Sequence, residues 1–204
     1  MAFSDKAPLG EIIKGIFDFS LALVGLVLVV PIIVLAWIVA SIETKSNGFF
    51  LQERVGKNGK LFALIKIKTM KPVLGVNTNV TQKNDVRITI SGAIFRKTKI
   101  DELPQLWNVL IGQMSFVGPR PDVKGYADKL QGKDRVVLLV RPGITGPASI
   151  KYKNEEELLS EQSNPEKYNS EVIWPDKVKI NVNYVNNWSF IQDVRYIYQT
   201  VANT

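Results

Sequence analysis

The sequence predicts an α/β fold with a membrane-anchoring helix at its N-terminus. Residues 19–42 carry no formal charge and are almost entirely apolar. Residues 61–70 alternate in the manner of a strand and follow Asn58-Gly59, a strong tight-turn pair. Residues 101–113 and 188–201 have apolar side chains at helical spacing. We therefore expect a membrane helix joined to a small, mostly helical domain with a short β-hairpin and interfacial amphipathic helices.

The residue content restricts the chemistry that this chain can perform. Its 204 residues include no His and no Cys, which excludes Ser-His-Asp and Cys-His nucleophiles, the usual zinc sites and disulfides. The length allows one domain with an appendage, so we divide the chain into an anchor over 1–44 and a domain over 45–204. The formal net charge of +7 is concentrated in residues 45–141. Such a charge favours nucleic acid, anionic lipid headgroups or a nucleotide diphosphate as partner.

The apolar segment 19–42 is long enough for a membrane. A straight helix of this length reaches roughly 36 Å, and the hydrocarbon core is roughly 30 Å thick. Pro31 lies near the centre of the segment and removes one backbone donor. Each half would then reach about one leaflet, so we expect a re-entrant helix that enters and leaves on the same face. A kinked helix that spans the bilayer is the alternative, and a buried helix of a soluble protein or a signal peptide fits less well.

The predicted hairpin over 49–70 carries basic side chains. Arg54 lies on its first strand, and Lys66 and Lys68 share one face of its second strand. Pairing of the two strands would bring Arg54 near these lysines, and a plain solvated strand face is the alternative interpretation.

A polar segment without periodicity follows the hairpin. Residues 70–85 contain Gly and Pro, so we expect a loop that covers a substrate. Arg87 comes next and precedes a basic amphipathic helix over 92–99. That helix suits a protein surface and the headgroup layer of a membrane equally well.

An acid pair, Asp101-Glu102, opens the apolar helical run 101–113. Pro104 is tolerated in the first turn of a helix, so one carboxylate would stand at the N-terminus and cap free backbone amides. A catalytic role is the competing interpretation, and the residues alone favour capping.

Two rigid turns each carry an arginine. They are Gly118-Pro119-Arg120-Pro121 and Arg141-Pro142-Gly143. Planar guanidinium groups suit bidentate contact with phosphate, so the two turns and the hairpin lysines could together hold a diphosphate. The apolar face over 188–201 fits core packing or the membrane interface, and core packing is the preferred interpretation.

Residues 100–122 resemble, nearly residue for residue, the signature of the bacterial sugar transferases, which are small monotopic phosphoglycosyl transferases of the PglC-like type. The pattern Gln-x-Arg-x-Gly-x-x-Gly-x-x-Phe at 52–62 and Lys-x-Lys-Thr-Met at 66–70 also match, and the likeness covers about residues 14–200. Two departures stand out: Gln113 replaces a common Asp, and Pro147-Ala148-Ser149 replaces Trp-Ala-Gln. The preference for a sugar or nucleotide can therefore differ from that of better-known members.

The resemblance implies a reaction. A sugar-1-phosphate passes from a UDP-sugar to polyprenyl (undecaprenyl) phosphate, giving polyprenyl-diphosphate-sugar and UMP, in the first membrane step of glycan assembly. It implies Asp101 as the nucleophile that forms a covalent phosphosugar intermediate, with Glu102 as its partner and Mg²⁺ bound by both carboxylates. The phosphate-binding candidates are Arg120, Arg141, Arg54, Lys66, Lys68 and Arg87.

The resemblance also implies a location. The chain would lie at the bacterial inner membrane with its domain on the cytoplasmic face, where a soluble nucleotide sugar meets a lipid-embedded acceptor, and a homodimer is compatible with it. The alternative function is a non-catalytic, membrane-anchored basic binding module. A nucleic-acid binder is disfavoured, because no nucleic-acid motif accompanies the positive charge.

Overall fold

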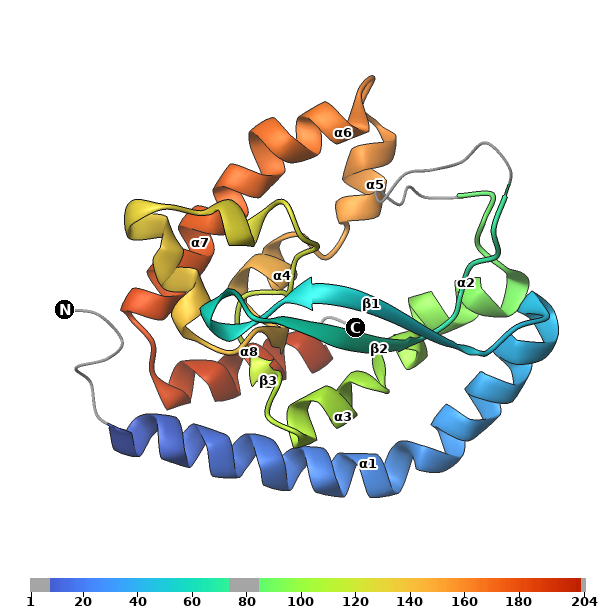
Figure 1. The fold of residues 1–204 in the computed structure, drawn as a ribbon, viewed down its shortest axis with the longest axis horizontal. Helices are drawn as coiled ribbons and strands as arrows, with labels where there is room; N and C mark the ends of the chain where they lie inside the picture. Colours follow the sequence, from blue (N-terminus) through green and yellow to red (C-terminus); the bar gives the residue numbers. More distant parts are fainter. Residues whose placement is uncertain (1–7, 74–84, 203–204) are drawn as a thin grey trace.

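A computed structural model describes residues 8–73 and 85–202 of the chain. Over these residues the molecule is mostly helical and contains two two-stranded sheets (Figure 1). The predicted combination of a long apolar helix, a short hairpin and a largely helical remainder is confirmed. The predicted covering loop over 70–85 falls mainly outside the described residues and stays a prediction.

The elements follow one another along the chain with short connections. The α-helices are α1 (Pro8–Thr44), α2 (Ile90–Lys97), α3 (Gln105–Leu110), α4 (Pro147–Lys151), α5 (Glu155–Ser160), α6 (Pro165–Tyr168), α7 (Trp174–Asn186) and α8 (Phe190–Ala202). The strands are β1 (Phe49–Val55), β2 (Leu61–Ile67), β3 (Ser115–Val117) and β4 (Gly143–Thr145). The 3-10 helices are η2 (Lys57–Gly59), η3 (Ile100–Glu102), η4 (Ala127–Lys129) and η5 (Gly132–Leu139), and η6 (Asn169–Ile173) is a π-helical turn.

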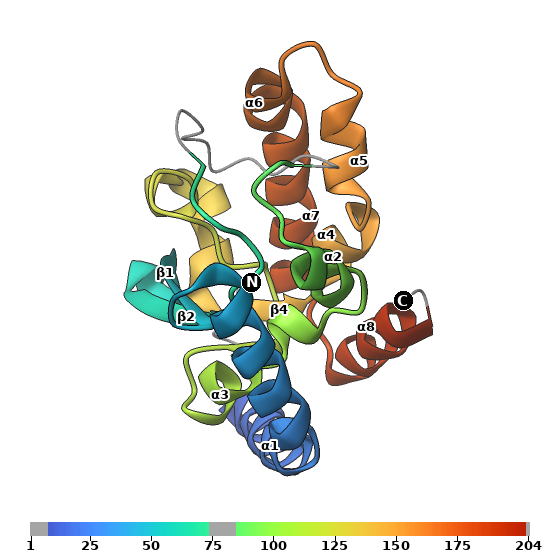
Figure 2. The same cartoon turned by 90° about the vertical axis from the view of Figure 1, so that its right-hand side faces the viewer.

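Helix α1 is long, apolar and bent (Figure 1). Pro31 lies inside it and cannot donate a backbone hydrogen bond, which is a common cause of helix bending. The segment Gly10–Thr44 is long and apolar enough to cross a membrane. In two perpendicular views α1, α3 and α8 lie toward one side of the molecule, and α5 and α6 lie toward the opposite side (Figure 1 and Figure 2).

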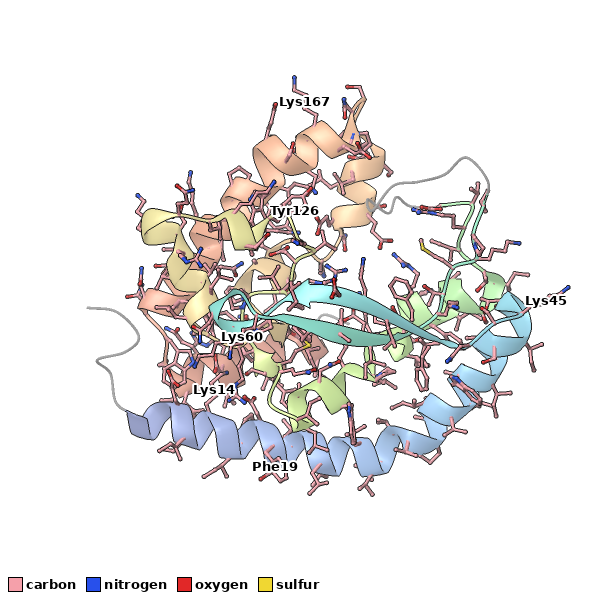
Figure 3. All side chains as sticks on the ribbon, in the orientation of Figure 1. Lys14, Phe19, Lys45, Lys60, Tyr126 and Lys167 are labelled. Carbon is pink, nitrogen blue, oxygen red and sulfur yellow. The ribbon has the colours of Figure 1, made fainter. Side chains whose placement is uncertain are left out.

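Helix α1 contacts the rest of the chain along its whole length with one face. The buried side chains of that face are Lys14, Asp18, Ala22, Ile33, Ala36 and Ala40. The opposite face exposes large apolar side chains, among them Ile16, Phe19, Val27, Leu28, Leu35 and Ile42. Phe19 points away from the domain, whereas Lys14 points toward it (Figure 3). Exposing such a large apolar face to water costs free energy, so this face requires contact with an apolar environment.

The hairpin packs against α1. Strand β1 pairs with β2 in antiparallel register, with Arg54 opposite Phe62 and Phe50 opposite Lys66. Leu64 of β2 packs with Ala22 of α1, with Val109 of α3 and with Met114, which follows α3. The hairpin predicted from the sequence is therefore confirmed, and it packs against α1 and α3.

Helix α3 is joined to the hairpin by one buried amide. The Asn108 side chain accepts a hydrogen bond from the Ile65 backbone N–H at 3.2 Å and donates to the Ala63 carbonyl at 2.8 Å. The helical run predicted over 101–113 is shorter than expected, because it starts as the 3-10 helix η3 and ends at Gly112 with a φ of 77°. A left-handed φ of this kind stops a helix.

The second sheet was not predicted from the sequence. Strands β3 and β4 pair in parallel, with Ser115 beside Gly143 and Val117 beside Thr145. Each strand has three residues, too few to show an alternating pattern.

The C-terminal helix α8 is only partly explained by core packing. Tyr196 and Ile197 pack on buried residues of α7 and β3. The stripe formed by Ile191, Val194, Tyr198 and Val201 is exposed. The preferred core interpretation therefore accounts for one face of α8, and the other face has the amphipathic character expected at an interface.

A buried ion pair fastens the start of α1 to the domain. Lys14 Nζ donates to Asp193 Oδ2 at 2.5 Å and to the Val117 carbonyl at 3.0 Å. Tyr184 Oη and Trp188 Nε1 also donate to the Asp193 carboxylate, at 2.7 and 2.9 Å. Asp193 is thus the shared acceptor that joins α1, α7 and α8.

Removal of the Lys14 ammonium should destabilise the whole molecule. Lys14→Met leaves the Asp193 carboxylate buried without its cation, so we expect a loss of about 3–5 kcal/mol in the free energy of unfolding. Lys57→Met is the matched control, because the Lys57–Glu11 pair is 3.5 Å long with both side chains at least 40% exposed; it should cost less than about 1 kcal/mol. Equal destabilisation in the two variants, measured by thermal or denaturant unfolding, would contradict the assignment.

Candidate functional site

The acid pair lies on η3, not at a helix cap. Lys99 precedes η3 with a left-handed φ of 58°, and Pro104 precedes α3. Neither helix receives a side-chain capping bond. The capping interpretation of Asp101 and Glu102 is therefore wrong, and both carboxylates are available for other contacts.

Two cations converge on Glu102. Its Oε1 accepts a hydrogen bond from Lys66 Nζ at 2.9 Å and a second from Arg120 Nη2. Lys66 comes from β2 and Arg120 from the Gly-Pro-Arg-Pro turn, so three distant parts of the sequence meet at one carboxylate oxygen. The Glu102 and Lys66 side chains are 14% and 19% exposed, which places the contact in a partly desolvated setting where charge interactions are strong.

These contacts shift the pKa values of the groups involved. Burial alone would raise the pKa of Glu102, but Arg120 and Lys66 hold that pKa well below its usual value. Burial lowers the pKa of Lys66, and Glu102 opposes this shift. The negative charge of Glu102 raises the pKa of Arg120. Glu102 is therefore an ionised anchor for two cations.

Asp101 has a different environment from its neighbour. It is 6% exposed, and its Oδ1 has no hydrogen-bond partner among the described residues. Burial raises the pKa of Asp101, while Lys66 lowers it and the charge of Glu102 adds to the increase. A poorly solvated carboxylate with a free oxygen is suited to nucleophilic attack or to metal binding.

Arg54 completes the group of cations around the acid pair. Its Nη2 donates to Gln52 Oε1 at 2.6 Å and its Nη1 donates to the Pro121 carbonyl at 3.1 Å. Burial and the neighbouring Arg120 lower the pKa of Arg54 to about 10. Its Nε is buried without a partner among the described residues, so the guanidinium has a donor to spare for a ligand.

Two glycine-containing turns pack backbone to backbone and position Arg120. A Cβ on Gly143 would lie 2.1 Å from the backbone nitrogen of Gly118, and one on Gly118 would lie 2.5 Å from the Arg141 carbonyl oxygen. Gly118 N–H donates to Thr145, and Gly143 N–H donates to Pro119. This contact requires glycine at both positions.

Three of the predicted phosphate ligands contact other groups. Arg141 Nη2 lies 3.4 Å from Asp18 Oδ2 of α1. Lys68 Nζ donates to Ser46 Oγ at 2.9 Å, and Arg87 Nη2 pairs with Asp85 Oδ2 at 2.6 Å. The structure thus brings Arg54, Lys66 and Arg120 to the acid pair and directs the side chains of Arg141, Lys68 and Arg87 elsewhere.

Asp122 is a third carboxylate near these cations that sequence reasoning missed. Burial raises its pKa to about 7, although Lys177, Arg54 and Arg120 all act in the opposite direction. Lys177 Nζ itself contacts Glu155 Oε2 at 2.6 Å. The position of Asp122, directly after the Gly-Pro-Arg-Pro turn, was the available signal.

The carboxylates fit a magnesium ion only if a substrate completes the coordination. Among the described residues, no group of three or more His, Cys, Asp or Glu side chains could hold a metal alone. Asp101 Oδ1 is free, whereas Glu102 Oε1 is shared by two cations. Mg²⁺ commonly binds one or two carboxylates together with substrate phosphates and water, and this donor set suits that mode.

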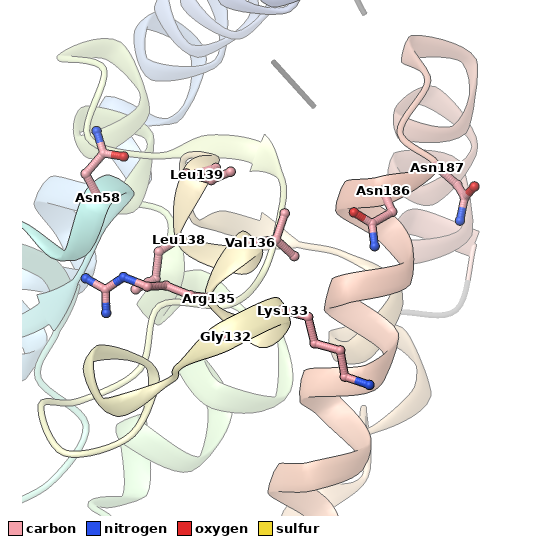
Figure 4. A pocket seen from close by; sticks show the side chains of 9 residues that line it. All are labelled: Asn58, Gly132, Lys133, Arg135, Val136, Leu138, Leu139, Asn186 and Asn187. Atoms are coloured by element: carbon pink, nitrogen blue, oxygen red, sulfur yellow. The ribbon is translucent and has the colours of Figure 1, made fainter. Parts of the chain in front are cut away.

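A groove of about 830 Å³ lies away from the acid pair (Figure 4). Its lining residues are Asn58, Gly132, Lys133, Arg135, Val136, Leu138, Leu139, Asn186 and Asn187. The lining contains no carboxylate and none of the predicted site residues. Chemistry on phosphate requires charged groups that converge, so the acid pair, not this groove, is the candidate active site.

The chain is similar to known sugar transferases. The protein-family model of the bacterial sugar transferases matches residues 9–204. An "uncharacterized sugar transferase EpsL" of Bacillus subtilis (strain 168) is 36% identical over 190 residues, covering 93% of this chain and 86% of the relative.

Two relatives have more specific names. A putative undecaprenyl-phosphate N-acetylgalactosaminyl 1-phosphate transferase of Bacillus subtilis (strain 168) is 43% identical over 131 residues, which is 64% of this chain and 73% of the relative. A UDP-glucose:undecaprenyl-phosphate glucose-1-phosphate transferase of Klebsiella pneumoniae is 32% identical over 198 residues, which is 93% of this chain and 39% of that protein.

The lowered pKa of Glu102 predicts a specific acid sensitivity. Because this pKa is lower in the folded chain than its usual value of 4.5, the ionised carboxylate stabilises the fold above pH 4.5 and loses that effect as the pH falls further. The difference in unfolding free energy between the native chain and Glu102→Gln should therefore be largest near pH 7 and shrink below pH 4.5. Glu11→Gln, which removes an exposed carboxylate, is the control, and a Glu102→Gln difference independent of pH would refute the assignment.

Proposed function

The chain belongs to the bacterial sugar transferase family and is an enzyme of the phosphoglycosyl transferase type, and on this premise we propose that it moves a sugar-1-phosphate from a UDP-sugar to polyprenyl phosphate. The products are polyprenyl-diphosphate-sugar and UMP. The observation that carries the proposal is the division of the acid pair. Glu102 is paired with two cations, while the adjacent Asp101 keeps a buried oxygen free.

Asp101 is the nucleophile of the proposed reaction. Its free oxygen attacks the phosphorus attached to the sugar, the bond from that phosphorus to the UMP oxygen breaks, and a phosphosugar stays bound to Asp101. Polyprenyl phosphate then attacks the same phosphorus and restores the carboxylate. Carboxylate nucleophiles of this kind divide one difficult transfer into two easier steps with ping-pong kinetics.

The cations act on the charge of the diphosphate. Arg120, Arg54 and Lys66 lie around the acid pair and are the donors available to phosphate oxygens. Glu102 holds two of them in fixed positions before the substrate arrives, so little reorganisation is needed during the reaction. Asp101 and Glu102 would hold Mg²⁺ if substrate oxygens completed its coordination, and the ion would then add to the charge neutralisation on the diphosphate.

We propose that α1 is re-entrant and stays on the side of the membrane where the domain lies. Both ends of α1 contact the same folded unit: Lys14 binds Asp193 near its start, and Glu43 accepts hydrogen bonds from Ile90 and Ser91 near its end. A helix that spans the bilayer would carry one end away from the domain. The exposed apolar face of α1 would instead be immersed in one leaflet.

Further exposed apolar side chains suit the same interface. Trp107 and Ile111 lie at α3, and the stripe that includes Ile191 and Tyr198 lies on α8. Because α1, α3 and α8 lie toward one side of the molecule (Figure 1 and Figure 2), their apolar faces can enter one membrane surface together. This arrangement would bring the lipid acceptor to the acid pair. The proposed surface is the cytoplasmic face of the bacterial inner membrane, and the product enters glycan assembly.

The alternative, a non-catalytic basic module, explains less. An inert module has no use for a buried carboxylate oxygen without a partner, since such a group is destabilising.

Release of UMP tests the proposed reaction. With Mg²⁺, polyprenyl phosphate and a panel of UDP-sugars, the native enzyme should release UMP with at least one donor. Asp101→Asn should reduce that rate by about 10⁴-fold or more, because it removes the nucleophile without changing its size. Asp134→Asn, a carboxylate of η5 outside the site, should keep the native rate. UMP release that persists in Asp101→Asn would refute the nucleophile.

Labelling tests the re-entrant helix. The chain has no Cys, so Glu11→Cys and Lys45→Cys introduce single thiols near the two ends of α1. Both should react with a membrane-impermeant maleimide in vesicles of one orientation, together with Lys133→Cys in the domain. Reaction of the two ends in vesicles of opposite orientation would demonstrate a spanning helix.

A further inference from the structure

Gln105 is a buried glutamine of α3 to which the proposed reaction gives no role. It is 2% exposed, and its Nε2 atom, a hydrogen-bond donor, is buried without a partner among the described residues. Native proteins pair nearly all of their buried polar groups, because an unpaired donor loses its bonds to water and gains none in return. The side-chain amide of Gln105 therefore destabilises the free enzyme.

The backbone places Gln105 one helical turn after the acid pair. Between Glu102 and Gln105, Leu103 has φ and ψ of −54° and −37°, and Pro104 has −62° and −16°. Both conformations are helical, so η3 leads into α3 through helical turns. Residues three apart lie on the same face of a 3-10 helix and of an α-helix. Gln105 therefore shares a face with Glu102.

Two contacts with β2 bracket Gln105 on that face. Three residues before it, Glu102 Oε1 accepts a hydrogen bond from Lys66 Nζ at 2.9 Å. Three residues after it, the Asn108 side chain accepts a hydrogen bond from the Ile65 backbone N–H at 3.2 Å. Lys66 and Ile65 are adjacent residues of β2. Gln105 therefore lies against this strand, between the two contacts and beside the acid pair.

Buried atoms without a partner are concentrated around the acid pair. Six such side-chain atoms are present among the described residues, and three of them belong to Arg54, Asp101 and Gln105. The Asp101 oxygen is an acceptor, and the Arg54 and Gln105 nitrogens are donors. A phosphoryl group that presents its phosphorus to the carboxylate and its own oxygens to the two donors would satisfy all three atoms.

We propose that the Gln105 amide donates a hydrogen bond to a nonbridging oxygen of the phosphoryl group that Asp101 attacks. This inference rests on the proposed transferase reaction. When the Asp101 oxygen bonds to phosphorus, the other oxygens of that phosphorus lie beside the carboxylate, one helical turn from Gln105. The amide is neutral and held in place by burial, so it stabilises charge on the phosphoryl oxygens without reorganising. No covalent bond to Gln105 forms or breaks.

A packing role is the alternative explanation for Gln105. A glutamine retained for the fold alone would have its amide bonded inside the protein, as the Asn108 amide is bonded to β2. Loss of such a bond destabilises a protein, whereas loss of an unpaired buried donor does not. The two explanations therefore make opposite predictions for the stability of a variant that lacks the amide.

Gln105→Met separates the two roles, because methionine has nearly the shape of glutamine and lacks the donor. The full-length enzyme is mixed with Mg²⁺ and the UDP-sugar that supports UMP release, without polyprenyl phosphate, and the rate of the UMP burst is measured. The variant should lose about 10²-fold in this rate, which is the effect of removing one such donor. Its thermal unfolding midpoint should equal or exceed that of the native chain, because no hydrogen bond within the fold is lost.

Two comparisons make the outcome decisive. Gln131→Met, the same change at an exposed glutamine before η5, should keep the native burst and midpoint. When sulfur replaces a nonbridging oxygen on the sugar-bearing phosphorus, one diastereomer should slow the native enzyme more than it slows Gln105→Met. A native burst rate in Gln105→Met, a lower unfolding midpoint, or equal sulfur effects in both enzymes would overturn the role of Gln105 and leave the transferase intact. Absence of any burst in the native enzyme would instead refute the proposed function.

Discussion

The contact of Lys66 and Arg120 with a single oxygen of Glu102 is the interaction on which the candidate site depends. It joins the hairpin, η3 and the Gly-Pro-Arg-Pro turn, which are otherwise separate in sequence. Adjacent carboxylates normally repel each other and share their cations. Here one carboxylate binds both cations, and its neighbour is left buried with a free oxygen. In the proposed reaction, this division gives two residues of the same chemical type different roles, anchor and nucleophile.

Contacts elsewhere in the fold fix the positions of the two cations that bind Glu102. Gly118 and Gly143 allow two turns to pack backbone to backbone, and this contact positions Arg120. The Asn108 side-chain amide joins α3 to β2, and this link positions Lys66 relative to the acid pair. The apolar helix α1 is fixed to the same elements. Its buried face packs against the hairpin through Ala22 and Leu64 and is fixed at the start by Lys14. The acid pair therefore cannot be moved independently of the apolar surface that we propose to enter the membrane.

The sequence predicted the elements whose signals are local. The hairpin follows from alternation and Asn58-Gly59, the apolar helix from the uncharged run, and the family from a resemblance spread over a continuous stretch. It could not say which partner a side chain contacts in the folded chain. Arg141 was predicted at phosphate, and in the structure its side chain contacts Asp18, because the direction of a side chain at a turn is not encoded in spacing. The β3–β4 pairing joins two three-residue strands, which are too short to show an alternating pattern. The raised pKa of Asp122 follows from its burial, which its position after the turn does not reveal.

Trapping of the covalent intermediate tests the central claim most directly. The native enzyme is incubated with the UDP-sugar and Mg²⁺ in the absence of polyprenyl phosphate, quenched, and examined by intact-mass and peptide mass spectrometry. The account predicts one added phosphosugar per chain, located on the peptide that contains Asp101 and lost when polyprenyl phosphate is added. A phosphosugar located on Glu102, or UMP release without any covalent adduct, would contradict the division of roles within the acid pair.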